Sequence, residues 1–414
     1  MRVRRSLVSI VLLFGTLGSA LWLTGCGSDP VADNTIQVPQ EQPTIAAAVK
    51  AAKSGNIILI ASGTYKEHVV VNTPDITIRG EDRNGVLLDG GGTLDAAFTV
   101  TANRVAIENL TVRRYTGAGI FVGSAQAGVS IERYRLSYVT SFNNDGFGLE
   151  AAESNHGLIE HSYVSGNGSA GLQINSCSAC DVVVEDLTAD SNAVGLSTSN
   201  VVGRVAVVDS TFRANRVGLM PNAADSRKQP KSGHIVIAGD VIVDNGNPMT
   251  PDVADGSFGS GILVGGGSVV TVVRNRVTGN AAIGIGLISL NALHPAGTRV
   301  IGNVLADNGL DLVYAPTGAK DAAGNCFSTN QFTRSLPRRI QELMSCTRLP
   351  ADFRIPVLKH FSAPAGISSS EVPAPPEQPT MSEKQKYSLG GSGDVPGAFN
   401  VDSITLPPDP SSAG

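Results

Sequence analysis

The stretch "SNAVGLSTSNVVGRVAVVDSTFRANRVGL", residues 191–219, repeats one phrase within itself. Asn192 precedes Gly195 by three residues, and 23 residues further on Asn215 precedes Gly218 by three residues. A fixed period of roughly 20–50 residues is the sequence signature of a repeat architecture. The stretch therefore predicts a chain built from stacked units of about this length.

The same register extends over much of the chain. Glycines that precede an apolar residue recur at spacings of 23 to 27 residues, with one spacing of 43: Gly119, Gly146, Gly171, Gly195, Gly218, Gly261, Gly284 and Gly309. Between them an apolar residue recurs at Ile107, Ile131, Ile159, Val184, Val207, Ile237, Val272 and Val300, and a second apolar residue follows each after five positions. An asparagine column completes the pattern at Asn167, Asn192, Asn215, Asn245, Asn280 and Asn308.

This pattern predicts an all-β fold of a particular kind. Each repeat contains short strands whose alternate residues point inward, separated by turns in which Asn or Gly adopts a positive φ at little cost. Repeats stacked about 4.8 Å apart pair their strands in parallel and share one core. The "LxxLxLxxN" spacing of leucine-rich repeats is absent, so we predict a single-stranded parallel β-helix.

The N-terminal part of the repeat region carries a resemblance to a known family. The segment "PTIAAAVKAAKSGNIILIASGTYKEHVVVNTPDITIRGE", residues 43–81, followed by the repeats, resembles right-handed parallel β-helix proteins of the pectate-lyase-like superfamily. The resemblance implies a coil over residues 35–346 with a short N-terminal capping helix and polysaccharide along its outer face. An apolar helix face agrees with such a cap: Ile45, Ala48, Val49 and Ala52.

The two ends of the chain differ from the repeats. Residues 1–25 resemble a bacterial lipoprotein signal peptide, which implies export, lipidation of Cys26 and a membrane-anchored protein with a linker over residues 26–34. The alternative is an uncleaved membrane anchor. We expect an extended segment over residues 347–361 and, because of its Pro, Ser and Gly content, a disordered tail over residues 362–414.

Charge and cysteine content limit the possible partners. A net charge of −5 with 16% charged residues provides no basic surface for nucleic acid, so we expect no nucleic-acid partner. We also expect a monomer. Without Cys26, four cysteines remain, which allow three pairings in an oxidising compartment. A zinc site with Cys177 and Cys180 would need Cys326, several repeats away, so we predict a local Cys177–Cys180 disulfide. We pair Cys326 with Cys346 because residues 326–346 look like a C-terminal cap in which a short helix covers the last repeat.

Candidate catalytic residues are few. "NND" at Asn143–Asp145 and "NHG" at Asn155–Gly157 echo polygalacturonase motifs, but the further motifs of those enzymes are missing. Asp145 and His156 remain as catalytic candidates, and the alternative is that they are turn residues, because Asp, Asn and His are common in turns. The long repeat adds insertions at residues 220–233 and 246–261, which in solenoids form loops, often on the binding face.

One outward column carries charge. The residue after the first apolar position is Glu108, Glu132, Glu160 and Glu185 in successive repeats, and the next position is Asn109, Arg133, His161, Asp186 and Asp209. We favour a solvated face balanced by Arg133, Arg113 and Arg135. One alternative is that these carboxylates serve acid/base chemistry, with Arg133 and His161 as further catalytic candidates. The other is that Glu132, Glu160 and Glu185 hold Ca²⁺ or meet a glycan beside Arg133 and His161; no cofactor is otherwise required.

These observations favour a lipid-anchored protein that binds or organises polysaccharide at the cell envelope. The missing catalytic motifs argue against the alternative, a polysaccharide lyase, epimerase or hydrolase that uses the outer face. Fold alone does not separate the two, because solenoids host both.

Overall fold

The structure is a computed structural model that describes residues 34–124, 126, 128–222, 233–252, 257–289, 293–318, 323–348, 353–359, 361–382 and 400–409. The signal sequence, Cys26 and most of the insertion at residues 220–233 lie outside these ranges. Within them, no helix has the length and apolar character needed to cross a membrane. The described residues belong to one unit, Asp33–Gly414.

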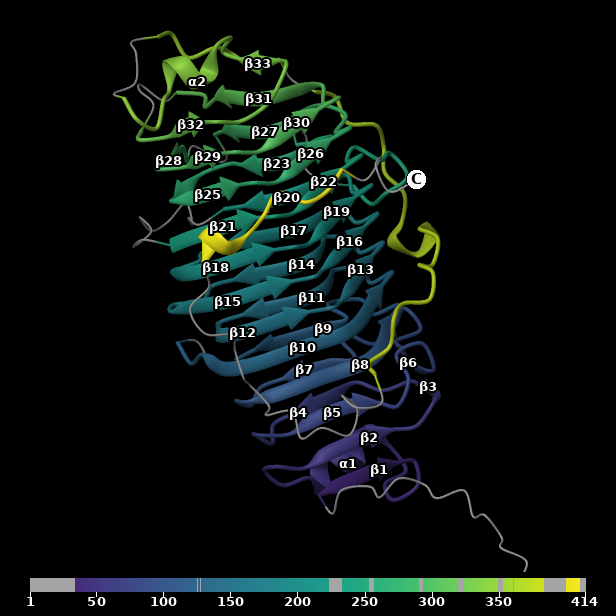
Figure 1. Cartoon of the computed structure of the whole chain (residues 1–414). Coiled ribbons are helices and arrows are strands. Elements are labelled where there is room, and N and C mark those ends of the chain that lie inside the picture. Colours follow the sequence, from purple (N-terminus) through teal and green to yellow (C-terminus); the bar gives the residue numbers. More distant parts are fainter. Residues whose placement is uncertain are drawn as a thin grey trace, which may run out of the picture. The chain divides into compact units, whose positions relative to one another are not determined.

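Parallel strands wind into a right-handed coil in which most turns contribute three strands (Figure 1). We call the three columns of strands the first, second and third stacks, in chain order within a turn. The first and second stacks form one 20-stranded sheet, because β8 and β10 run through both, and the third stack is an 11-stranded sheet.

The first and second stacks contain β1 (Thr35–Val38), β2 (Ile57–Ile60), β3 (Gly63–Tyr65), β5 (Thr77–Gly80), β6 (Val86–Asp89), β8 (Val105–Arg113), β10 (Ile131–Phe142), β12 (Ser154–Glu160), β13 (Tyr163–Ser165), β15 (Cys180–Glu185), β16 (Thr188–Asp190), β18 (Gly203–Val208), β19 (Thr211–Arg213), β21 (Gly233–Ala238), β22 (Val241–Val243), β25 (Val270–Val273), β26 (Arg276–Thr278), β29 (Arg299–Ile301), β30 (Val304–Ala306) and β32 (Cys326–Ser328). The third stack contains β4 (Val69–Val71), β7 (Phe98–Val100), β9 (Ile120–Gly123), β11 (Phe147–Ala152), β14 (Ala170–Asn175), β17 (Val194–Ser199), β20 (Val217–Pro221), β23 (Ser260–Val264), β27 (Ile283–Ile288), β31 (Leu310–Ala315) and β33 (Ser335–Leu336). A small extra pair is β24 (Gly267–Ser268) with β28 (Pro295–Ala296).

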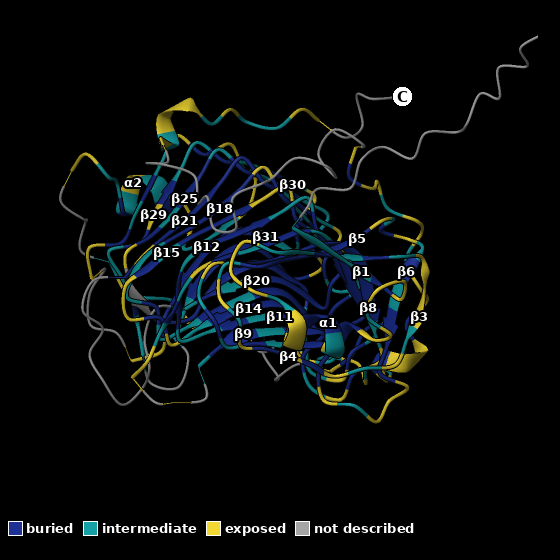
Figure 2. Cartoon of the chain, turned by 90° about the horizontal axis from the view of Figure 1, so that it is seen from below, coloured by how far each residue is buried: buried dark blue, intermediate teal, exposed yellow. Residues whose placement is uncertain are grey.

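The strands of the coil are mostly buried (Figure 2), and their inward apolar residues form one core of aligned columns. In the first stack, Ile159, Val184 and Val207 lie directly above one another and are fully buried. Burial of each such side chain contributes roughly 1.5–3 kcal/mol relative to exposure. The alternation of inward apolar and outward residues therefore explains why one turn needs its neighbours to be stable.

The asparagine column forms a continuous ladder between the second and third stacks. The backbone N–H of Asn167 and its Nδ2 both donate to Oδ1 of Asn192, at 3.1 and 2.9 Å. The same contacts recur along the ladder, whose members are Asn144, Asn167, Asn192, Asn215, Asn245, Asn280 and Asn308. Because these side chains satisfy buried turn N–H groups, the ladder fixes the turn geometry. The predicted column is confirmed.

Glycine is required beside this ladder because the backbones of adjacent turns approach closely there. A Cβ placed on Gly195 would lie 2.5 Å from the carbonyl oxygen of Gly218. The strand register places Gly148 and Asp311 in this column, where the sequence pattern suggested Gly146 and Gly309.

A second ladder, between the first and second stacks, was not predicted. Its upper part repeats the asparagine geometry: the N–H and Nδ2 of Asn275 donate to Oδ1 of Asn303, both at 2.9 Å. Lower in the coil the position holds serine or aspartate, and Leu187 interrupts the ladder between Ser162 and Ser210. The members are Ser162, Ser210, Asp240, Asn275, Asn303 and Asn330. The mixture of residue types hid the column in the sequence.

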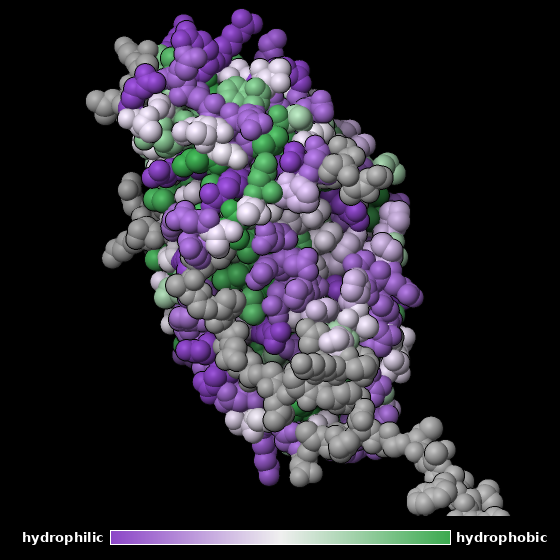
Figure 3. Space-filling model, viewed as in Figure 1, coloured by the Kyte–Doolittle hydropathy of each residue, from purple (hydrophilic) through white to green (hydrophobic). Residues whose placement is uncertain are grey.

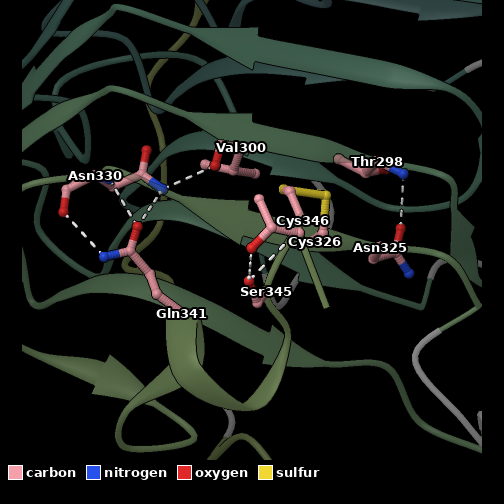
Figure 4. Close-up of a disulfide and its surroundings, with 9 residues drawn as sticks. Thr298, Val300, Asn325, Cys326, Asn330, Gln341, Ser345 and Cys346 are labelled. Atoms are coloured by element: carbon pink, nitrogen blue, oxygen red, sulfur yellow. Dashed lines mark hydrogen bonds between the residues drawn. A yellow bond between two sulfur atoms is a disulfide. The ribbon is translucent and has the colours of Figure 1, made fainter. Parts of the chain in front are cut away.

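Both ends of the coil are capped. At the N-terminal end, α1 (Ile45–Ala51) buries Ile45, Ala48 and Val49, and the Thr44 side chain accepts from the N–H of Ala47. At the other end, α2 (Ile340–Leu343) covers the last turn, where Gln341 Oε1 accepts the final ladder bond from the N–H of Asn330 at 2.7 Å (Figure 4). Capped ends keep strand edges from pairing with other chains.

Two disulfides join the four predicted cysteines in the predicted pairs. Cys177 bonds to Cys180 in the turn before β15, and Cys326 bonds to Cys346 beside α2 (Figure 4). The Cα atoms lie 5.2 and 4.8 Å apart, within the usual range for disulfides. Both links are local, as predicted.

The C-terminal segment differs from the expectation of disorder over its described part. Residues 361–382 and 400–409, which we call the strap, lie against the outside of the coil (Figure 1). Coil side chains donate to strap carbonyls: Asn143 Nδ2 to Val372 at 2.8 Å, and Arg83 Nη1 to Pro379 at 3.0 Å. The strap has little apolar surface, but hydrogen-bond donors of the coil hold it in place. These donors lie outside the strap, so its own composition does not reveal them.

The strap also covers apolar residues that face outward from the first stack. Val401 and Ile404 pack against a cluster made of Ala206, Val208, Val236, Ala238 and Val273. These coil residues are at most 6% exposed although their side chains point away from the core. On the side seen in Figure 3, hydrophobic residues form an interrupted band along the coil, between hydrophilic surfaces.

Candidate functional site

The outward glutamate column contains three of the four predicted members. In the strand register, Glu108 pairs with Ser137, Ser137 with Glu160, and Glu160 with Glu185. Glu132 pairs with Asn155 instead, so its predicted place in the column is wrong.

The cause lies in the uneven length of the repeats around β10. The apolar position that aligns with Ile107 and Ile159 is Leu136, five residues beyond Ile131. Ile107 and Leu136 are 29 residues apart and Leu136 and Ile159 are 23 apart, so a regular spacing counted from Ile107 selects Ile131 instead.

Arginines neutralise the lower part of the column. Arg79 lies one turn below Glu108, and the two side chains form an ion pair at 2.7 Å with about 1% exposure each. Arg135 then bridges two glutamates, with Nη1 3.3 Å from Glu108 and Nε 2.8 Å from Oε1 of Glu160. Ser137 Oγ also donates to Glu160 at 3.1 Å. Arginines balance the charges, as favoured, and the predicted Arg135 is one of them, together with Arg79. Arg133 is exposed and Arg113 pairs with Asp89. The favoured solvated face is wrong for this part of the column, because Glu108 is buried.

The next position forms a bend at which every member has a left-handed backbone: Asn109, Tyr138, His161, Asp186 and Asp209, with φ between 47° and 58°. Tyr138, not Arg133, fills the predicted second place. His161 Nδ1 lies 2.7 Å from Asp186 Oδ2, and the ring of Tyr138 lies 4.8 Å from the His161 ring. The hydrogen bond to Asp186 raises the pKa of His161.

Acidic groups gather above His161. Burial, together with the nearby carboxylates of Glu160 and Asp209, raises the pKa of Glu185. Burial and Asp186 raise the pKa of Asp209 in the same way. This part of the bend is a negatively charged edge without an arginine in the column.

The residues present do not fit the proposed Ca²⁺ site. Glu132 lies in another column, and Oε1 of Glu160 already accepts from Arg135 and Ser137. Over the described ranges, no three His, Cys, Asp or Glu side chains are grouped as metal ligands.

Glu132 has a different partner. Its Oε2 lies 2.8 Å from His156 Nδ1, and its Oε1 accepts from Asn155 Nδ2 at 2.8 Å. Both His156 and Glu132 are about 40% exposed, and Arg133 beside them is exposed too. A histidine whose Nδ1 is held by a carboxylate offers Nε2 for proton exchange or hydrogen bonding.

The catalytic candidates do not form one cluster. His156 lies near the start of β12, and His161 follows its end, roughly 17 Å away along an extended strand. Asp145 lies in the turn between the second and third stacks, where its Oδ1 accepts from Ser369 Oγ of the strap at 2.7 Å.

Sequence reasoning missed several charged residues of the outer face. Arg79 could have been found by extending the column one turn down, since Ile78 aligns with Ile107. Nothing in the local sequence marks Arg83, a buried residue whose Nη1 donates to the carbonyl of His161 at 3.0 Å.

Comparisons agree with this architecture. The family model described as "Right handed beta helix region" matches residues 58–332. Pectate lyase Pel9A is 17% identical over 68% of this chain and 73% of its own, with a TM-score of 0.47. The A-module of mannuronan C-5 epimerase AlgE4 from Azotobacter vinelandii is 15% identical over 75% of this chain and 92% of its own, with a TM-score of 0.51.

The Dettilon tailspike protein is 13% identical over 73% of this chain and 68% of its own, with a TM-score of 0.48. No protein of curated function matches the sequence. The family match spans well over half of the chain and agrees with the stacked parallel strands. The chain therefore belongs to the right-handed β-helix family.

Proposed function

We propose that this chain is an exported, lipid-anchored protein that binds polysaccharide along the outer face of the first stack, around β10, β12 and β15. The observation that carries the proposal is the row of oriented polar groups on this face. Arg135 is held by two glutamates, and His156 and His161 are each held by a carboxylate. Groups held in place before binding lose little entropy when they engage sugar hydroxyls.

The proposed ligand, a polysaccharide, is inferred from proteins of the same fold. One of them, by its name, is a mannuronan epimerase, so its substrate is a polysaccharide. The regular 4.8 Å spacing of strands in a β-helix offers a long, repetitive surface that suits a repetitive polymer.

Binding is favoured over catalysis because the catalytic candidates are dispersed and Asp145 is engaged by the strap. One observation favours the enzyme alternative: the exposed His156–Glu132 pair beside Arg133 combines a proton acceptor with a cation that would neutralise a substrate carboxylate.

The test is a binding assay with alginate, polygalacturonate and a neutral glucan, combined with detection of new reducing ends and unsaturated products. We expect His161→Gln and His156→Gln to weaken polymer binding about threefold to tenfold. His68→Gln, on an exposed histidine bonded to Thr99 of the third stack, is the matched control and should bind normally. Product formation that His156→Gln abolishes would establish the enzyme; failure of every polymer to bind would refute the proposal.

The proposed localisation depends on the signal sequence and Cys26, which lie outside the described ranges. Lipidation at Cys26 predicts that Cys26→Ser moves the protein from the membrane to the soluble fraction, because stable anchoring needs acyl chains. The two disulfides support an oxidising, extracytoplasmic compartment. A variant that stays in membranes after a high-salt wash would contradict the lipid anchor.

A further inference from the structure

A pocket of about 180 Å³ lies between the strap and the second stack, away from the face discussed above. The second stack contributes Leu87 from β6, Thr111 and Arg113 from β8, and Thr140 and Phe142 from β10. Strap residues 375–377, which are two prolines and Glu377, form the opposite wall, and Asn84 lies at its edge. Drug-sized ligands occupy roughly 300–1,000 Å³, so this pocket suits a smaller molecule, such as one sugar residue.

The strap wall is fixed on both sides of the pocket. Before it, Asn143 Nδ2 donates to the carbonyl of Val372 at 2.8 Å. After it, Asn84 and Gln378 exchange two hydrogen bonds, at 2.9 and 3.0 Å. Prolines 375 and 376 add stiffness because their φ angles are restricted. The pocket therefore exists before a ligand arrives.

Positive charge exceeds negative charge around the coil wall. Asp89 accepts from Arg113 Nε at 2.9 Å and from Arg114 Nε at 2.8 Å, so two guanidinium groups share one carboxylate. Arg113 also lies over the ring of Phe142, 5.8 Å from its centroid. Of the two arginines, only Arg113 lines the pocket.

Arg83 adds a second cation behind Thr140. Its Nε donates to Thr140 Oγ1 at 2.8 Å, and its other donors reach the carbonyls of Val139, His161 and Pro379. None of the ion pairs among the described residues gives Arg83 a carboxylate partner. Burial lowers its pKa to about 10, which leaves it charged at neutral pH.

We propose that this pocket binds one carboxylate-bearing sugar residue, whose carboxylate faces Arg113 and whose ring lies between Leu87 and the strap prolines. Arg113 retains Nη1 donors, and an Arg–carboxylate contact is among the stronger hydrogen bonds in proteins. Thr140 Oγ1 accepts from Arg83 and can still donate its proton, and Thr111 Oγ1 donates to the carbonyl of Arg83 and can still accept, so each hydroxyl keeps one bond for a sugar hydroxyl. Asn84 Nδ2 keeps a second hydrogen beside its bond to Gln378. This inference rests on the proposed polysaccharide function, and it adds a site that requires the strap.

The experiment titrates the full mature protein with sodium glucuronate, glucose and sodium acetate, and follows the Leu87 and Thr140 methyl resonances by NMR. We expect glucuronate to shift both resonances and to bind about tenfold more tightly than glucose or acetate. Arg113→Gln should weaken glucuronate binding about tenfold. Arg114→Gln is the matched control, because it removes the same contact to Asp89 without touching the pocket wall, and it should bind normally.

Glu377→Gln removes the acidic group of the strap wall and should strengthen glucuronate binding. Equal losses in Arg113→Gln and Arg114→Gln, acetate binding as tight as glucuronate, or no shift at Leu87 and Thr140 would each overturn the pocket. Polymer binding measured in parallel separates the two proposals. If the polymer binds and glucuronate does not shift these resonances, only the pocket is refuted, whereas a wild type that binds no polymer refutes the proposed function.

Discussion

Replacing Asp240 with asparagine should stabilise the protein, and more so as the pH rises. Asp240 is fully buried in the second ladder, where Asn275, Asn303 and Asn330 occupy the higher positions. Its Oδ1 accepts from the N–H of Ser210 at 2.8 Å, but Oδ2 has no hydrogen-bond partner among the described residues.

The geometry of the ladder explains why Oδ2 of Asp240 has no partner in the described part of the chain. At Asn275 the corresponding atom is Nδ2, which donates to the carbonyl of Ile237 and to Oδ1 of Asn303, both at 2.9 Å. Asp240 has an oxygen, Oδ2, where Asn275 has this donor, and Oδ2 is buried without a hydrogen-bond partner among the described residues. Burial accordingly raises the pKa of Asp240 well above its ordinary value.

The gain in stability expected of Asp240→Asn depends on pH. Leaving a buried polar atom unsatisfied costs about 1–3 kcal/mol, which Asp240→Asn should recover near neutral pH. Because the folded pKa exceeds the unfolded value, the folded state binds more protons, and wild-type stability falls as the pH rises from about 4 towards the folded pKa. The variant lacks this fall, so its advantage should be small at about pH 4 and grow with pH.

The assay is guanidinium unfolding followed by circular dichroism at several pH values. Asp244→Asn is the matched control: Asp244 is exposed and left-handed, with φ 55°, and asparagine tolerates that conformation. Its stability should stay within about 0.5 kcal/mol of wild type. A less stable Asp240→Asn variant, or a gain that does not change with pH, would show that Asp240 is not an unsatisfied, ionised group in the folded protein.

Three further predictions test the bend, the column and the strap. The hydrogen bond to Asp186 raises the pKa of His161, so protonated His161 stabilises the fold below about pH 6.5, and this stabilisation is lost as the pH rises through the pKa of the folded state. His161→Gln should therefore flatten this part of a plot of melting temperature against pH. An unchanged slope would contradict the role given to the His161–Asp186 pair. Wild-type melting temperatures should be the same in EDTA and in millimolar Ca²⁺, because Arg135 and Ser137 already occupy Glu160; a rise with Ca²⁺ would show a cation site. Arg83→Met should speed limited proteolysis within residues 361–382 by removing the donor to Pro379, while far-ultraviolet circular dichroism stays unchanged; equal cleavage rates would show that the strap is held without Arg83.

The strap forms part of the outer surface of the coil. Val401 and Ile404 cover apolar residues of the first stack, and Ser369 engages Asp145. A ligand on the outer face therefore meets a surface made of coil and strap together. Variants that shorten the chain after the last coil turn would remove one wall of the glucuronate pocket.

The repeat, the asparagine ladder, the caps and the disulfide pairs could all be predicted from residue types and their spacing. These features depend on local chemistry: inward apolar positions and asparagine side chains that bond from one turn to the next recur at fixed spacing, and the paired cysteines lie near one another in the chain. The ladder from Asn167 to Asn308 could be identified without coordinates because every turn needs the same residue there.

The register of β10, the partners of the glutamates and the path of the strap depend on the folded chain. Leu136, not Ile131, aligns with Ile107 and Ile159, because the repeats on either side of β10 differ in length, so Glu132 meets His156 while Ser137 joins Glu108 and Glu160. Asp240 replaces asparagine in a ladder whose members differ in type, so no periodic signal marks it. Arg83 holds strap residues almost 300 positions away, and only folding brings such distant groups together.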